Sequence, residues 1–213
     1  MRFDDPVVLP GRGDSPAACI ANCEPLLGTA GQGYVERRGI PLAVAEAAGV
    51  VFHPNFGGRA AVLVPLKDKA NGITSVHGRF LEVRGSQNKM LTVGIGNGTI
   101  NVLGGWQADP FIIVEGLFDA LSLATCGWSC VATIGRWASW LPEVSAGRIV
   151  WIAFDGTHSG ERDFARYTAL LAGAEVRRLA PPTRCKDWNT ALVKRGAPAV
   201  TRWLRDHVSK ANS

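Results

Sequence analysis

Several features are scarce in this sequence, and each scarcity excludes a class of protein. No run approaches the roughly 18 consecutive apolar residues that a membrane-spanning helix requires, so we expect no membrane span. The 5 cysteines are an odd and sparse set, which argues against a disulfide-stabilised scaffold. The N-terminal residues 1–6 lack the apolar stretch of a secretory signal. We therefore expect a cytoplasmic protein in a reducing compartment.

Charged residues are also few, at 19% of the chain against about 25% in an average globular domain. Hydrophobic residues make up 46% of the 213, which is enough for a sizeable core and excludes wholesale disorder. Lysine and arginine total 23 and aspartate and glutamate total 18, giving a net charge of +5. This balance favours an anionic partner without identifying it.

The charges are unevenly distributed along the chain. Residues 30–90 contain eight basic side chains against four acidic ones, and residues 177–205 contain eight against Asp187 alone. The carboxylates of Glu115, Asp119 and Asp155 lie between these basic segments. Acidic positions framed by basic segments suit metal ions that face phosphates. Two solvated basic faces explain the same distribution, so charge alone leaves both interpretations open.

The first half of the chain is typical of short helices followed by antiparallel strands. Residues 1–29 are predicted to form a loose arm that includes a short helix within 19–27. Residues 30–108 are predicted to form a small mixed α+β, mostly antiparallel subdomain, in which Asn71-Gly72 marks a hairpin between two apolar runs. The expected helices cover 33–38 and 41–48, and the expected strands cover 50–52, 60–65 and 73–81.

Residues 109–208 are typical of an α/β subdomain with a parallel sheet, and residues 209–213 of a tail. Phe111 to Val114 is a continuous apolar run, as expected of a strand buried on both faces. Strands alternate with helices from there on, which favours βαβ units. The expected strands cover 111–114, 130–134, 149–154 and 174–179, and the expected helices cover 117–126, 161–172, 188–195 and 198–208.

Acidic residues follow three of the predicted parallel strands. Glu115 directly follows the first strand, with Asp119 one turn into the next helix, and Asp155 directly follows another strand. Asp187 stands at a helix start after the last strand. Functional sites of open α/β sheets gather at the carboxyl ends of strands, and carboxylate oxygens suit Mg²⁺. Helix capping by Asp187 and a first-turn dipole interaction of Asp119 are the structural alternatives.

These residues carry a family resemblance that covers about 30–208. Phe111-Ile-Ile-Val-Glu115-Gly-Leu-Phe-Asp119 resembles the first motif of the Toprim domain of primases, topoisomerases and certain nucleases. Val131 to Gly135, Asp155-Gly-Thr157 and Lys186-Asp187-Trp188-Asn189 resemble the motifs that follow. The upstream half is similar to the N-terminal subdomain of the DnaG-type primase catalytic core, on the segments Tyr34 to Ile40, Gly58-Arg59, Leu63 to Pro65, His77 to Phe80 and Asn88 to Leu91.

The resemblance implies a role for each matched residue. Glu115 and Asp119 match catalytic acids, with Glu115 a metal ligand or a proton acceptor and Asp119 a support of the first motif. Glu115, Asp155 and Asp187 match metal ligands for Mg²⁺ or Mn²⁺. The residues that match nucleic-acid and nucleotide contacts are Arg59, Arg79, Lys89 and Lys186.

The second acidic motif departs from the family pattern, because Thr157 stands where Toprim proteins usually carry a second aspartate. A threonine offers only a neutral oxygen, so we expect weaker metal affinity. Asn189 and His158 are the neighbouring candidates for a further ligand, and imidazole suits zinc or manganese better than magnesium. We expect no zinc site, since Cys19-x₃-Cys23 has no second ligand pair nearby.

The sequence thus favours a primase-type nucleotidyltransferase that makes short primers on single-stranded DNA from nucleoside triphosphates, with a replicative helicase as a partner in trans. Two alternatives remain open. One is a nucleic-acid-binding module with a reduced metal site, and the other is a Toprim nuclease. Among the tryptophans, Trp137 and Trp140 follow Arg136 in a loop-like stretch and are the base-stacking candidates, whereas Trp151 and Trp203 are expected in the core.

Overall fold

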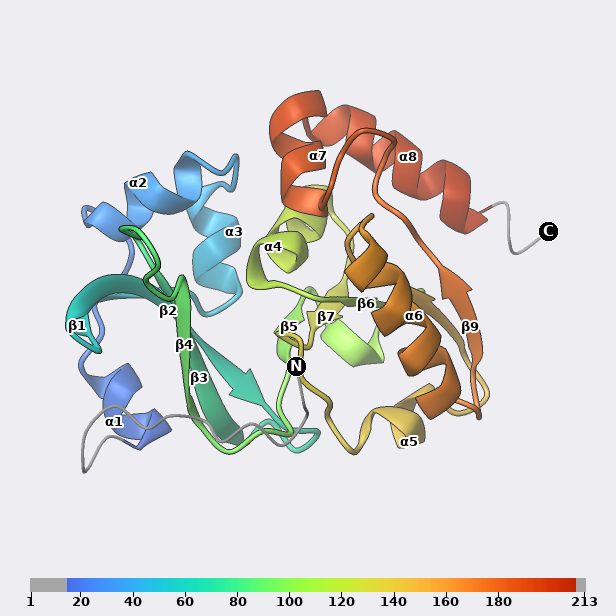
Figure 1. Cartoon of the computed structure of the whole chain (residues 1–213), viewed down its shortest axis with the longest axis horizontal. Coiled ribbons are helices and arrows are strands. Elements are labelled where there is room, and N and C mark those ends of the chain that lie inside the picture. Colours follow the sequence, from blue (N-terminus) through green and yellow to red (C-terminus); the bar gives the residue numbers. More distant parts are fainter. Residues whose placement is uncertain (1–14, 210–213) are drawn as a thin grey trace. The chain divides into compact units, whose positions relative to one another are not determined.

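The computed structural model of the chain describes residues 15–209. Residues 1–14 of the arm expected over 1–29, and most of the expected tail, lie outside these residues. The chain divides into two compact units. Among the described residues, the first reaches to Ile100 and includes residues 136–138, and the second comprises residues 101–135 and 139–209. Figure 1 labels the α-helices and strands of both units.

The first unit is built on a four-stranded antiparallel sheet in the order β1-β2-β3-β4. Three short helices precede the sheet, and α1 packs against β2 and β3 while α2 packs against α3 and β1. This arrangement confirms the predicted mixed, mostly antiparallel character of this half. The elements are α1 (Pro16–Ala21), α2 (Ala30–Glu36), α3 (Leu42–Ala47), β1 (Val51–Phe56), β2 (Arg59–Lys67), β3 (Ile73–Phe80) and β4 (Met90–Gly94).

The predicted hairpin at Asn71-Gly72 joins β2 to β3. Asn71 has a φ of 66°, in the left-handed region that asparagine tolerates better than most residues. The Asp68 carboxylate accepts hydrogen bonds from the backbone N–H groups of Ala70 and Gly72, both at 2.9 Å. These bonds satisfy the turn's donors, so the local sequence fixes the register of the two strands.

The first helix lies earlier than predicted. The sequence suggested a helix within 19–27, whereas α1 spans Pro16–Ala21. The hydroxyl of Ser15 accepts the N–H of Ala18 at 3.1 Å, and Pro16 occupies the first turn, where its missing N–H costs nothing. The cap and the proline therefore set the helix start.

The second unit is an α/β structure around a five-stranded sheet in the order β5-β7-β6-β8-β9. The neighbours β6–β7, β6–β8 and β8–β9 are parallel, which confirms the predicted parallel sheet. The strands are β5 (Ile100–Val102), β6 (Phe111–Val114), β7 (Cys130–Ala132), β8 (Ile149–Ile152) and β9 (Glu175–Arg178). The helices are η1 (Gly105–Gln107), α4 (Leu117–Thr125), α5 (Leu141–Ser145), α6 (His158–Leu170), α7 (Trp188–Arg195) and α8 (Ala197–Ser209).

The central strand β6 explains why this unit presents a functional edge. All four of its residues are fully buried, as the uninterrupted apolar run predicted. The helix that follows it, α4, is also buried along nearly its whole length and packs against α7 and β7. Because parallel strands end at the same edge of a sheet, the polar residues after β6 and β8 emerge side by side.

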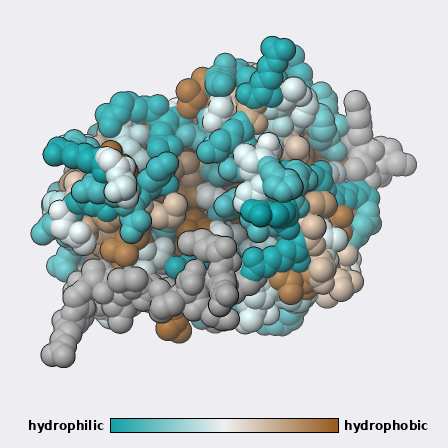
Figure 2. All heavy atoms as spheres, viewed as in Figure 1, coloured by the Kyte–Doolittle hydropathy of each residue, from teal (hydrophilic) through white to brown (hydrophobic). Residues whose placement is uncertain are grey.

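The surface offers no extended apolar face in the view of Figure 2, where hydrophobic side chains form small separate patches among hydrophilic ones. Within residues 15–209, no helix combines the length and the hydropathy that a membrane crossing demands.

Candidate active site

The carboxylates predicted for the site gather at the carboxyl edge of the second unit's sheet. Glu115 follows β6 directly, and Asp155 lies three residues beyond the end of β8. Asp187 is the N-cap of α7. Burial raises the pKa of both Glu115 and Asp155, and neighbouring negative charge adds to each rise, from Asp155 on Glu115 and from Asp187 on Asp155. Three segments far apart in sequence therefore bring their acids into one electrostatic cluster.

Glu115 and the neighbouring Asp119 hold their protons far more tightly than an exposed carboxyl does. Burial, reinforced by the charge of Asp155, raises the pKa of Glu115 to about 7. Burial likewise raises the pKa of Asp119 to about 7, with further contributions from Asp155 and Asp187. Concentrated negative charge of this kind calls for a cation at the edge.

Asp119 ties the first motif to the last one. It lies in the first turn of α4, and one of its carboxylate oxygens accepts the backbone N–H of Trp188 at 2.9 Å, in the first turn of α7. A side chain on Gly116 would place its Cβ 2.8 Å from the other carboxylate oxygen. The side chain is buried, so it acts as a link between α4 and α7 rather than as a group open to a substrate.

The turn that carries Asp155 is held closely on both sides. The N–H of Gly156 donates to the carbonyl of Lys186 at 2.7 Å, which joins this turn to the residue before Asp187. On the other side, a Cβ on Gly160 would lie 2.0 Å from the carbonyl oxygen of Asp155. Only glycine at position 160 allows α6 to begin this close to the Asp155 backbone.

Asp187 combines two roles at the start of α7. Its carboxylate accepts the N–H of Thr190 at 2.6 Å, which is the capping role that the sequence offered as an alternative. The other carboxylate oxygen lies 3.8 Å from the ammonium of Lys186, which is largely exposed. One oxygen of Asp187 therefore caps the helix, and the other lies near the exposed ammonium of Lys186.

Thr157, which stands where Toprim proteins usually carry a second aspartate, caps a helix. It is the N-cap of α6, and its hydroxyl accepts the N–H of Gly160 at 3.2 Å. His158 is the exposed first residue of that helix. The side-chain amide of Asn189 is buried and donates to the hydroxyl of Ser122 at 3.1 Å. The Thr157 hydroxyl and the Asn189 amide nitrogen are therefore both used in bonds within the protein.

The donor set fits a magnesium-type ion that also binds substrate. Among residues 15–209, no three His, Cys, Asp or Glu side chains are grouped closely enough to hold a metal ion, so Glu115, Asp155 and Asp187 do not form a ready three-carboxylate site. Mg²⁺, however, usually takes one or two carboxylates and fills its other positions with water and phosphate oxygens. Over the same residues, the carboxylates of Glu115 and Asp155 accept no hydrogen bond, which leaves two hard oxygen donors available at the edge.

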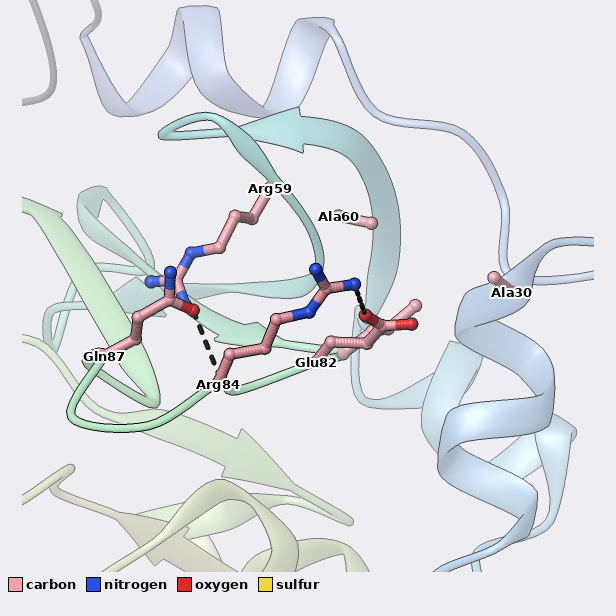
Figure 3. A pocket seen from close by; sticks show the side chains of 7 residues that line it. Ala30, Arg59, Ala60, Glu82, Arg84 and Gln87 are labelled. Atoms are coloured by element: carbon pink, nitrogen blue, oxygen red, sulfur yellow. Dashed lines mark hydrogen bonds and ion pairs between the residues drawn. The ribbon is translucent and has the colours of Figure 1, made fainter.

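The predicted basic contacts divide between the units, with Lys186 in the second and the other three in the first. Arg59 lies in a cavity of about 460 Å³, shown in Figure 3. Its guanidinium stacks 3.4 Å from the centre of the Phe80 ring and donates to Gln87 Oε1 at 3.3 Å and to the Asn88 carbonyl at 3.0 Å. Arg59 therefore braces the loop that leads to Lys89.

Arg79 lies within β3, and Lys89 directly precedes β4. Arg79 pairs with Met90 across these strands, and the carbonyl of Lys89 accepts the N–H of Phe80 at 3.2 Å. The buried Nε of Arg79 has no hydrogen-bond partner within the described part of the chain. Because this Nε is buried, the unused donor does not itself face an external ligand.

The aromatic and cysteine predictions have mixed outcomes. Trp140 was a stacking candidate, but it is buried and packs edge-on against Trp106 at 6.2 Å, so that prediction is wrong. Trp151 is in the core, whereas Trp203 is only partly buried and stacks on His207 at 4.0 Å. Cys126 and Cys130 are buried, and all the described cysteines are free thiols.

Sequence reasoning missed Arg178, which is the last residue of β9. Its guanidinium contacts the backbone at Asp155, and its charge offsets part of the rise in the pKa of that carboxyl that burial and Asp187 cause. The sequence placed it in a basic segment without a particular partner. One signal was available in the sequence: Arg178 ends a predicted strand, and Asp155 follows the end of another strand of the same predicted sheet.

Comparison with known proteins agrees with this geometry. The family model described as Toprim-like matches residues 112–192, which contain every carboxylate of the cluster. No curated protein matches the chain.

Solved primase structures share the fold. The Aquifex aeolicus primase, comprising zinc-binding and RNA polymerase domains, has a TM-score of 0.66 at 20% identity, over 85% of this chain and 57% of that one. A DnaG primase catalytic domain bound to single-stranded DNA has a TM-score of 0.62 at 21% identity, over 85% of this chain and 76% of that one. The primase fragment of the bacteriophage T7 primase-helicase has a TM-score of 0.58 at 19% identity, over 79% of this chain and 72% of that one.

These matches place a Toprim-like domain at residues 112–192, in a chain whose fold resembles primase catalytic cores. The chain spans little more than half the length of the Aquifex structure.

Proposed function

We propose that this chain is a primase-type nucleotidyltransferase that joins nucleotides into short primers on single-stranded DNA. The observation that carries the proposal is the gathering of Glu115, Asp155 and Asp187 at one edge of a primase-like fold, with Asp119 buried behind them. Phosphoryl transfer requires positioning and charge stabilisation more than covalent chemistry from the protein. A cluster of carboxylates that can hold divalent cations against phosphates supplies both.

Glu115 and Asp155 would hold Mg²⁺ or Mn²⁺, with one oxygen of Asp187 close by. When bound, such an ion neutralises charge on the phosphate oxygens and lowers the pKa of an attacking hydroxyl. A carboxylate at the position of Glu115 is suited to accept the proton that this hydroxyl releases as pyrophosphate leaves. Asp119 does not touch the substrate, and its bond to Trp188 positions Asp187 at the edge.

The template and the incoming nucleotide would meet basic side chains. Arg79 offers a guanidinium charge, Lys89 and Lys186 lie at exposed positions, and Arg59 braces the loop before Lys89. Cations of this kind bind phosphates by charge and, in arginine, by paired N–H donors. The DnaG domain in the comparison binds single-stranded DNA, and the T7 primase is joined to a helicase. We propose the same classes of partner here, with the helicase in trans.

One observation favours a second candidate, a nucleic-acid-binding module with a reduced metal site. Thr157 provides a neutral oxygen where the family usually has aspartate, and that oxygen already caps α6. A module of this kind binds single-stranded DNA in a salt-dependent manner without any need for metal. A Toprim nuclease would use the same acids for cleavage and differs only in the reaction.

The test is a template-dependent synthesis assay with purified chain, single-stranded DNA, labelled nucleoside triphosphates and either Mg²⁺ or Mn²⁺. We expect oligonucleotides from the wild type and a loss of at least about 100-fold in Glu115→Gln, because an isosteric amide supplies neither charge nor base. Glu175→Gln, at an exposed position in β9, is the matched control and should retain activity.

The same reactions separate the alternatives. Salt-sensitive DNA binding without synthesis under either metal would contradict the proposal and favour the binding module. Metal-dependent shortening of labelled DNA, abolished in Glu115→Gln, would favour the nuclease. Synthesis that persists undiminished in Glu115→Gln would contradict the assignment of the site.

A further inference from the structure

We infer that Arg178 is a positioning residue for Asp155: its guanidinium fixes the backbone turn beyond β8 and so aims this carboxylate at the metal position. The inference rests on the proposed function for the role of Asp155, and it is carried by hydrogen bonds within the second unit. Neither the family motifs nor the comparisons assign a role to Arg178.

The turn needs such a residue because β8 leaves the sheet before it reaches Asp155. The ladder between β8 and β9 ends at the pair Ile152 and Arg178, and the N–H of Leu179 donates to Ile152 at 3.0 Å. Beyond that point the carbonyls of Phe154 and Asp155 have no strand partner in β9. Phe154 is almost fully buried, so its carbonyl cannot rely on water.

Arg178 satisfies these carbonyls with one side chain. Its Nη1 donates to the carbonyls of Ile152 at 3.2 Å and Phe154 at 2.9 Å, and its Nη2 donates to that of Asp155 at 2.9 Å. A guanidinium offers five N–H donors in a rigid plane, so contacts to several carbonyls fix their relative positions. Side-chain exposure of Arg178 is only 17%, which limits competition from solvent.

The guanidinium is itself held by α6. Glu161 Oε1 accepts from Nε at 3.1 Å and from Nη2 at 2.7 Å. Glu161 lies in the first turn of α6, the helix that Thr157 caps and that approaches Asp155 through Gly160. The chain from Glu161 through Arg178 to the Asp155 carbonyl therefore couples the start of α6 to the orientation of the acid.

This arrangement suits a motif with only one carboxylate. A site with a single acid at this position depends more on the direction of that acid than a site with a pair. Groups that orient a metal ligand typically change metal affinity or activity by about 10- to 100-fold when removed. We expect an effect of that size at Arg178.

The variant Arg178→Lys keeps the charge and removes the planar set of donors. Its matched control is Arg177→Lys on the same strand, where the arginine pairs with Glu175. A second pair acts from α6: Glu161→Ala removes the acceptor, and Glu161→Gln retains an oxygen that can accept both bonds. Circular dichroism and thermal unfolding identify any variant that does not fold.

The first readout needs no metal. Amide hydrogen exchange of Gly156, whose N–H donates to Lys186, reports how firmly the turn is held. We expect exchange at least about 10-fold faster in Arg178→Lys and Glu161→Ala, with Arg177→Lys and Glu161→Gln close to wild type. Unchanged exchange in both Arg178→Lys and Glu161→Ala would overturn the inference.

The second readout is Mn²⁺ affinity, measured by the electron paramagnetic resonance of free Mn²⁺. We expect affinity about 10- to 100-fold weaker in Arg178→Lys, with Arg177→Lys unchanged. Wild-type affinity in Arg178→Lys would overturn the inference even if exchange were faster. A wild type that binds no Mn²⁺ would contradict the proposed metal site instead, and the exchange measurement would then decide the positioning claim alone.

Discussion

The carboxylate of Asp119 accepts the backbone N–H of Trp188 at 2.9 Å, and this bond joins the first turn of α4 to the first turn of α7. It brings together two motifs that lie 69 residues apart in the sequence. Because Asp187 immediately precedes Trp188, the bond also sets where the third acid of the edge stands. The buried Asp119 therefore shapes the site without being exposed to a substrate.

The first prediction concerns the pH dependence of stability and Asp119. Burial raises the pKa of Asp119 in the folded protein to about 7, whereas an unfolded chain releases the proton near 4. Between these values the folded state holds a proton that the unfolded state lacks. This contribution to stability is therefore present at low pH and is lost as the pH rises through 7.

Asp119→Asn removes that titration and retains an oxygen for the Trp188 N–H. Urea unfolding at pH 5 to 8 in the presence of a chelator should show a shallower fall in the free energy of unfolding for this variant, by up to about 1.4 kcal/mol per pH unit. Parallel pH profiles for the variant and the wild type would contradict the prediction.

The second prediction concerns the close approach at Gly160. A Cβ there would lie 2.0 Å from the Asp155 carbonyl oxygen, so Gly160→Ala must displace the turn or the helix. We expect a loss of about 1–3 kcal/mol in the free energy of unfolding, together with weaker Mn²⁺ binding. Gly173→Ala is the control, since its Cβ would meet Ala146 at an ordinary 3.9 Å. Equal free energies of unfolding for Gly160→Ala and Gly173→Ala would show that the short distance between residue 160 and the Asp155 carbonyl does not require glycine.

The third prediction concerns the neutral residue of the second acidic motif. Thr157→Val should cost about 1 kcal/mol, because the α6 cap is lost. Thr157→Asp should keep the cap and bind Mn²⁺ more tightly than the wild type, since aspartate caps helices well and adds a carboxylate beside Asp155. Calorimetric titration checks both variants. Metal affinity that is no higher in Thr157→Asp would show that position 157 does not face the ion.

The fourth prediction concerns Arg79 and single-stranded DNA. Arg79→Gln should weaken binding and lower the slope of log affinity against log salt by about 0.7, the contribution of one phosphate contact to a single strand. Fluorescence anisotropy at several salt concentrations gives this slope. Arg37→Gln, at an exposed position at the end of α2, is the control. An unchanged slope in Arg79→Gln would remove this residue from the interface.

The sequence predicted most of the second unit because its signals are strong and local. The short apolar run of β6 is typical of a strand buried on both faces, and the acids that follow the strands mark the carboxyl edge of the sheet. Helix α7 spans Trp188–Arg195, as predicted. Helix α5 was not predicted, because five residues beginning with Leu141 and Pro142 carry no detectable periodicity.

The contacts that orient the site were less predictable. Asp119 bonding to Trp188 and Arg178 bonding to the Asp155 carbonyl both join side chains to distant backbone, and such pairs leave no spacing pattern. Trp140 illustrates the opposite error, since a loop-like sequence suggested exposure and the ring is buried against Trp106. The role of Thr157 as a cap became visible only with the start of α6 at His158.

The most direct test of the central claim compares the wild type with Asp155→Asn in template-dependent primer synthesis with Mn²⁺. Asparagine keeps the size of the side chain and removes the charge that the metal requires. The account predicts oligonucleotide products from the wild type and a rate at least about 100-fold lower in the variant, with equal thermal stability. Equal rates of synthesis by the two proteins would contradict it, as would the absence of any product from the wild type.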